Sequence, residues 1–170
     1  MMDRRNSLRL IAASLLPLAT AACGFRPLHG TAAGGPAVTT ALASVTIPEP
    51  ESRLSQIIRN DLLSAIRPVG REQPDRYSLT LETRMQEINA IDLPEKGSVR
   101  RMVRLNVAFK LVGLQNGEAV YSGKTFSQAS YDETGQSFTD LQAKSNAVER
   151  AAKEASLDIR QRLAAHFAAG

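Results

Sequence analysis

The stretch SVRRMVRLNVAFKLVGLQNGEAVYSGKTFSQAS, residues 98–130, decides the fold of this chain. In its first half every second residue is large and apolar, whereas the residues between are mostly basic, polar or small. Such alternation is typical of a strand with one buried face and one wet face. The segment QNGE, residues 115–118, then predicts a hairpin turn, because Asn-Gly supplies the positive φ angles that such turns demand. Two long antiparallel strands, 98–114 and 119–130, are expected.

The preceding segments add two further strands and a helix. Residues 77–88 alternate in the same way and predict a third strand. Residues 41–47 contain β-branched side chains and stop at Pro48, which predicts a short first strand. Between them, apolar residues recur at helical spacing over 51–66, so we expect an amphipathic helix that lies on the sheet.

A long helix is predicted at the end of the chain, over residues 138–167. Its apolar stripe is rich in alanine, and Thr139 and Gln142 match the spacing of a capping box at its start. The order strand, helix, three strands, helix predicts an α+β fold. We expect a four-stranded, mostly antiparallel sheet with two helices packed on one face, after an N-terminal signal peptide and a tether.

The first 23 residues have the parts of an export signal. Arg4, Arg5 and Arg9 precede an uncharged apolar run over 10–22, and Cys23 follows two alanines. This is the layout of a secretory signal peptide, and the run is shorter than the roughly 20 apolar residues that span a bilayer. A cysteine at this place predicts lipoprotein processing, in which the thiol is acylated and the chain is cut before it.

Other readings of the signal remain open. Ordinary cleavage beside Ala21 or Ala22 would leave a free thiol on Cys23, and the paired arginines also faintly resemble a twin-arginine export signal. We divide the chain into a signal peptide (1–22), a lipidated tether rich in glycine and proline (23–40) and one α+β domain (41–170). Residues 23–170 have 18 basic and 16 acidic residues, a net charge of +2, which gives little support to a nucleic-acid partner.

Local signatures of catalysis or metal binding are absent from the sequence. His29 lies in the expected tether and His166 near the end of the last helix, and neither has a carboxylate or cysteine at ligand spacing. Asp132 and Glu133 are adjacent carboxylates, which a solvated loop before a helix explains. We therefore expect no enzyme, no metal site and no cofactor other than the covalent lipid on Cys23.

The motif CGFRPLHG, residues 23–30, resembles the mature N-terminus of the LptE family, the lipopolysaccharide-assembly lipoproteins of Gram-negative outer membranes. Members often begin Cys-Gly-Phe-Arg-Pro-Leu-Tyr-Gly, and here His29 replaces the tyrosine. The predicted order of elements is also similar to the family's fold. The resemblance implies a lipid anchor on Cys23 at the periplasmic face of the outer membrane. It also implies a plug complex with the β-barrel LptD that assists barrel assembly and the insertion of lipopolysaccharide, with direct binding of lipopolysaccharide as a further expectation.

Arg100, Arg101 and Arg104 are the candidate lipopolysaccharide contact, because guanidinium groups match phosphate oxygens in bidentate fashion. The alternative is a merely solvated sheet face whose charges pair with Glu82 and Glu118.

A second candidate is the loop over 91–97, expected to insert into the barrel through Ile91, Asp92, Leu93 and Lys96; an ordinary hairpin loop is the alternative. For the whole protein, the alternative function is an accessory lipoprotein that regulates an envelope enzyme or serves another trans-envelope lipid transporter.

Overall fold

The computed structural model describes residues 35–67, 70, 73–93 and 98–169. The elements, in chain order, are α2 (Gly35–Ala43), β1 (Val45–Thr46), α3 (Arg53–Ile66), β2 (Tyr77–Leu93), β3 (Ser98–Gly113), β4 (Ala119–Glu133) and α4 (Ser137–Ala169). Within these residues, no helix is both long and apolar enough to cross a lipid bilayer.

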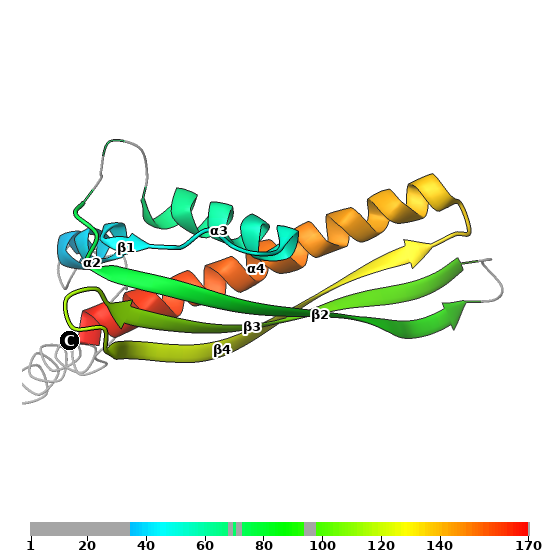
Figure 1. Cartoon of the computed structure of the whole chain (residues 1–170). Coiled ribbons are helices and arrows are strands. Elements are labelled where there is room, and N and C mark those ends of the chain that lie inside the picture. The colour runs from blue at the N-terminus through cyan, green and yellow to red at the C-terminus, as the bar shows by residue number, and fades with distance from the viewer. Residues whose placement is uncertain (1–34, 68–69, 71–72, 94–97, 170) are drawn as a thin grey trace, which may run out of the picture. The chain divides into compact units, whose positions relative to one another are not determined.

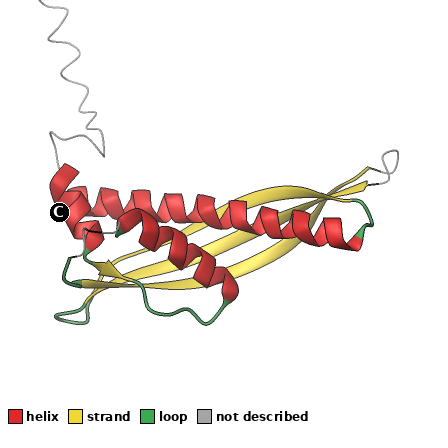
Figure 2. Ribbon diagram, turned by 90° about the horizontal axis from the view of Figure 1, so that it is seen from above, coloured by secondary structure: helices red, strands yellow, loops and turns green. Residues whose placement is uncertain are grey.

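The four strands form one sheet in the order β1-β2-β3-β4. The three long strands make an antiparallel meander, and β1 pairs in parallel with the start of β2. α3 and α4 cover one face of this sheet, and among the described residues no element covers the other face (Figures 1 and 2). The expected α+β fold, with a four-stranded, mostly antiparallel sheet under two helices, is confirmed, and α2 is an additional helix.

The core lies between the covered face of the sheet and the two helices. Odd-numbered residues of β3 point inward and are nearly inaccessible: Val103, Leu105, Val107, Phe109 and Leu111. On the helical side of the core, α4 contributes mainly alanines, among them Ala147, Ala151 and Ala155, all fully buried. These small side chains allow close approach, and the Ser127 hydroxyl on β4 donates to the Ala151 carbonyl at 2.6 Å. The predicted alanine stripe is therefore the contact between helix and sheet.

The predicted strand over 41–47 is wrong in extent. Residues 35–43 form α2, which buries Val38 and Leu42 one helical turn apart, and only Val45 and Thr46 are in strand. Burial of these side chains outweighs the weak helix propensity of a segment that contains glycine and three β-branched residues. α2 thus includes residues 35–40, which we expected in the tether; the signal peptide and the rest of the tether lie outside the described residues.

Two local predictions are also corrected. The hairpin turn is at the expected place, but only Gly117 has a positive φ angle (70°), so Asn116 does not adopt the left-handed conformation. α4 begins at Ser137, and Thr139 is inside its first turn and is not the N-cap. Instead Asp140 holds the preceding turn, because its Oδ1 accepts from the amide and the hydroxyl of Thr134 at 2.8 and 3.1 Å.

Candidate functional site

The uncovered face of the sheet is the candidate site. The alternation along the strands directs the even-numbered side chains to this side, on β2 as far as Ile88, on β3 from Arg100 and on β4. Among the described residues its charged side chains are five basic and two acidic: Arg84, Arg100, Arg104, Lys110 and Lys124, with Glu82 and Asp132. We name this surface the basic face. It is polar and rich in cations, and no helix of the described residues covers it, so it is suited to contact an anionic or polar partner.

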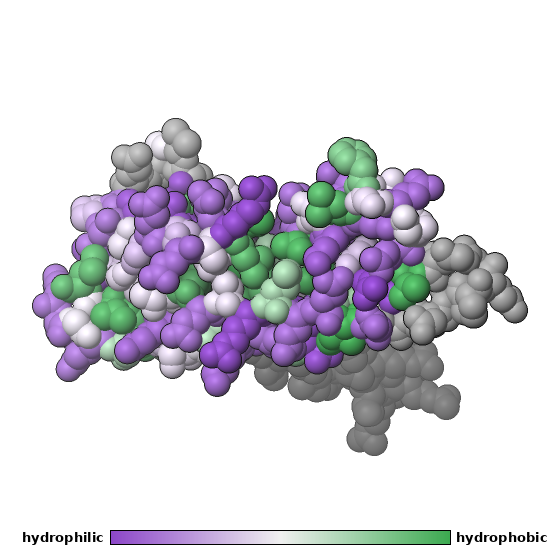
Figure 3. All heavy atoms as spheres, turned by 45° about the vertical axis from the view of Figure 1, so that its right-hand side comes forward, coloured by the Kyte–Doolittle hydropathy of each residue, from purple (hydrophilic) through white to green (hydrophobic). Residues whose placement is uncertain are grey.

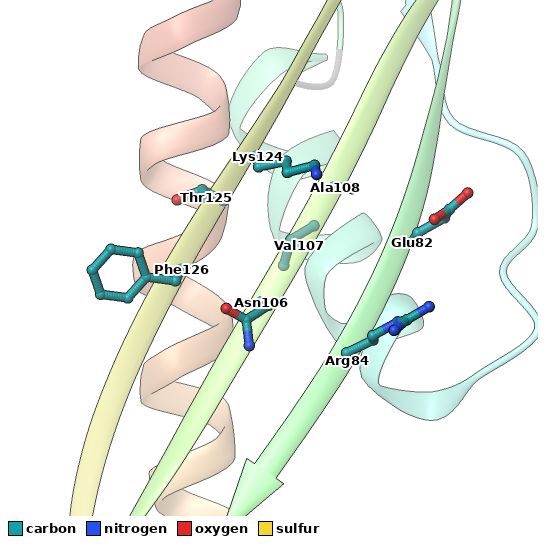
Figure 4. Close-up of a pocket in the computed structure, with 8 residues that line it drawn as sticks. All are labelled: Glu82, Arg84, Asn106, Val107, Ala108, Lys124, Thr125 and Phe126. Carbon is teal, nitrogen blue, oxygen red and sulfur yellow. The ribbon is translucent and has the colours of Figure 1, made fainter.

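A shallow hollow of about 430 Å³ lies at the centre of the basic face. Its floor is Ala108, whose strand neighbours are Glu82 on β2 and Lys124 on β4. The small methyl side chain leaves space between these longer ones. Phe126 stands at the rim with 67% of its surface exposed, which is unusual for a phenylalanine (Figure 4).

The cations of the basic face differ in what they contact. Arg100 forms a bidentate pair with Asp132, at 2.8 and 3.2 Å, and this hydrogen bonding raises the pKa of the guanidinium. Arg104 donates at 2.7 and 2.8 Å to the side-chain oxygen of Gln128, with the Gln128 amide oriented so that its oxygen faces the guanidinium.

Three cations are available for a ligand. Arg84, Lys110 and Lys124 form no ion pair within the part of the chain that the structure describes. The predicted pairing of the arginines with Glu82 and Glu118 is not found; Arg100 contacts Asp132 instead.

Arg101 lies on the opposite side of the sheet from Arg100 and Arg104. Its guanidinium donates to Glu133 and to Asn89, and the hydrogen bond to Glu133 raises the pKa of Arg101. The structure therefore brings Arg100 and Arg104 together on the basic face but does not bring Arg101 to them. The predicted three-arginine cluster is not one surface.

A polar network lies beside Arg101 on the covered side. The Glu87 carboxylate accepts from Lys144 of α4 and from the Tyr131 hydroxyl, and these hydrogen bonds lower the pKa of Glu87. Burial, and then the bond to Glu87, raise the pKa of Tyr131. The network joins β2, β4 and α4 where the apolar core ends.

The predicted contact loop is shorter than expected. Ile91, Asp92 and Leu93 belong to β2 and pair with Arg100, Val99 and Ser98. Lys96 and Cys23 lie outside the described residues. Asp132 and Glu133, expected in a loop, are the last residues of β4.

Other candidate groups have structural partners. His166 stacks on Tyr121, with ring centroids 4.7 Å apart and planes 14° apart. Across the described ranges, no three His, Cys, Asp or Glu residues gather in a way that could hold a metal ion. On the face that Figure 3 shows, apolar residues form small groups within a mainly hydrophilic surface. The exposure of Phe126 was missed, although its even position, shared with Lys124, would have placed it on the wet face.

Solved structures of bacterial lipoproteins resemble this fold. A Caulobacter crescentus CB15 protein named "putative lipoprotein" is 27% identical, with a TM-score of 0.66 over 79% of this chain and 98% of that chain. A minor lipoprotein from Acinetobacter baumannii is 16% identical (TM-score 0.52, 71% and 88% covered). Rare lipoprotein B from Shewanella oneidensis is 17% identical (TM-score 0.51, 71% and 92% covered). No family model matches the chain, and no curated protein matches it.

Proposed function

We propose that this protein is a lipoprotein anchored through Cys23 at the periplasmic face of the outer membrane, where it forms a plug complex with the β-barrel LptD. In that complex it assists barrel assembly and the insertion of lipopolysaccharide into the outer leaflet. The basic face carries the proposal: a plug must present polar side chains to the polar lumen of a barrel. The likeness to bacterial lipoproteins and the CGFRPLHG motif support it.

The cations without ion pairs are the proposed contact for the phosphates of lipopolysaccharide. Lys124 on β4 and Arg84 on β2 line the hollow, and Lys110 lies on β3 two residues from its floor, Ala108. A phosphate that binds these three cations does not have to displace a protein carboxylate from them. At Arg100 it would compete with Asp132, so we assign Arg100 a smaller part. Arg101 is left out of the contact because it is on the covered side.

Cross-linking tests the complex with the barrel. A photo-cross-linking residue at Lys110 samples the basic face, and one at Lys153, exposed on α4, is the matched control. In intact cells we expect the Lys110 position to capture LptD much more than the Lys153 position. Capture from Lys153 alone, or co-purification with an envelope enzyme in place of a barrel, would favour the accessory-lipoprotein function.

Charge reversal tests the contact with lipopolysaccharide. We expect Lys110→Glu with Lys124→Glu to weaken binding of purified lipopolysaccharide about tenfold or more at moderate salt. Arg53→Glu with Lys153→Glu changes net charge equally but leaves the basic face intact. Equal losses for both double variants would mean that only net charge matters, and the proposed contact would be wrong.

A further inference from the structure

β4 is the last strand of the sheet, so its outer edge presents backbone groups that pair with no other strand of the described residues. Arg150 of α4 donates to the Ser130 carbonyl at 2.8 Å, so this carbonyl points away from β3 and toward the edge. In a strand the direction of the backbone groups repeats every second residue. The N–H and C=O groups of Lys124, Phe126 and Gln128 therefore point to the same edge.

α4 runs along this edge on the covered side. The contacts of Ala151 with Ser127 and of His166 with Tyr121 show that α4 passes β4 in the opposite direction. Leu157 is seven residues after Arg150, hence on the same side of the helix, and is 46% exposed. A helical rise of about 1.5 Å per residue moves Leu157 about 9 Å beyond Ala151, nearly three strand residues back from Ser127. It therefore lies beside the edge near Lys124, two residues from Phe126.

On the other side of the edge stands Phe126, 67% exposed and projecting from β4 away from β3 (Figure 4). Lys124, two residues before Phe126 and on the same face of β4, forms no ion pair within the described residues. The edge thus combines free backbone donors and acceptors with an exposed apolar side chain on each side and a cation.

We propose that the β4 edge is a docking site for an extended segment of a partner protein, which adds to the sheet as a fifth strand. Only an extended backbone matches a row of edge amides and carbonyls. The exposed Leu157 and Phe126 call for an apolar residue on each face of that segment. The excess of cations on the basic face calls for acidic residues beside Lys124. This proposal does not depend on the function proposed above.

A second copy of the chain does not fit the edge through antiparallel pairing. Two β4 strands paired in this way would lie about 4.8 Å apart, with both α4 helices on the same side of the joined sheet. Packed helices need an interaxial distance of 8–10 Å, so the two α4 helices would collide. A single partner strand brings no such helix.

Hydrogen exchange on the full-length protein in detergent micelles tests the site. The probe is the acetylated peptide Thr-Glu-Val-Glu-Val-Leu-Thr, whose two glutamates and leucine share one face while its valines share the other. Its control has lysine in place of both glutamates. At millimolar concentration the acidic peptide should slow exchange of the Lys124, Phe126 and Gln128 amides about tenfold. The amides of Thr125 and Ser127, which face β3, should not change. The lysine peptide should protect the edge at least about fivefold less.

Proline substitution locates the binding. Gln128→Pro removes an edge N–H without removing a ladder hydrogen bond to β3, and should abolish the protection. The matched control is Met85→Pro on β2, where the same alternation directs the odd-numbered amides to the outer edge. The Met85→Pro variant should bind the acidic peptide as the parent does. Lys124→Glu should make the lysine peptide the better ligand, a result that does not require the proline variant to fold.

Three outcomes would overturn the proposal. The first is no protection at millimolar acidic peptide, and the second is equal protection in Gln128→Pro. The third is edge amides that become protected without peptide as the protein concentration rises, which would mean that a second copy occupies the edge.

Discussion

Gly123 lies directly against the ring of Phe109, its partner across the β3–β4 pair: a Cβ atom on Gly123 would be 2.6 Å from Phe109 Cζ. Real Cβ atoms essentially never approach so closely. Glycine is required here for space, since the φ angle of Gly123 is not in the left-handed region. The absence of a side chain on β4 lets the Phe109 ring lie across both strands and pack against Tyr121, at a centroid distance of 5.8 Å.

Gly123→Ala should therefore destabilise the fold, by about 1–3 kcal/mol, because the Phe109 ring must move within a packed core. Urea unfolding followed by circular dichroism measures the change. Ser122→Ala, on the same strand but facing solvent, is the control and should stay within about 0.5 kcal/mol of the parent. A Gly123→Ala variant as stable as the parent would show that the ring has room to shift.

Ala151→Leu should also be destabilising, by about 2 kcal/mol or more, because the added side chain separates α4 from β4. It would also break the short hydrogen bond from Ser127 to the Ala151 carbonyl. Lys153→Leu adds the same side chain at an exposed position of α4 and serves as the control. Comparable losses in the two variants would mean that close packing at Ala151 is not the cause.

The contribution of Glu87 to folding stability should decrease as the pH becomes acidic. Its pKa is lowered in the folded state by the hydrogen bonds from Lys144 and Tyr131. A carboxylate with a depressed pKa stabilises the fold above its unfolded pKa, about 4.5, and this contribution is lost as the pH falls through the folded value. At pH 7 we expect the free energy of unfolding of the parent to exceed that of Glu87→Gln by about 0.5–1 kcal/mol, and the difference to shrink steadily as the pH falls below about 4.5. A difference that does not change with pH would contradict the ionic role of Glu87.

The proposed lipid on Cys23 should make its sulfur unreactive. In the mature protein purified from membranes and denatured, we expect no labelling by a maleimide, because an acylated cysteine carries its lipid through a thioether. Ser122→Cys places a thiol at an exposed strand position and should be labelled readily in the same protein. Quantitative labelling of the parent chain would mean an unacylated thiol and would exclude the proposed anchor.

The long strands could be predicted because alternation and turn chemistry agree along residues 98–130. Counting outward from Asn116 in equal steps pairs Lys110 with Ser122 and Arg100 with Asp132, as the structure does. The ion pair of Arg100 could thus have been found from the turn alone. The same alternation separates Arg101 from its neighbours, but a run of basic residues in sequence suggested one cluster.

Other features depend on contacts that sequence patterns do not carry. α2 forms where glycine, proline and threonine predict no helix, because Val38 and Leu42 are buried by the rest of the fold. β2 and β4 continue past their apolar parts because polar partners meet there, such as Arg101 with Glu133. On the basic face, charge could be predicted, whereas the hollow over Ala108 depends on the cross-strand neighbours of a small residue.

The attachment of β1 to β2 through only two residue pairs has a mechanical consequence. Tension applied to the chain ahead of Gly35 reaches the meander through α2 and this short parallel contact. The remaining sheet is held by long antiparallel ladders, which share a load over many hydrogen bonds. Under a steady pull from its N-terminal side, the domain would therefore release α2 and β1 first, while β2, β3 and β4 stay paired.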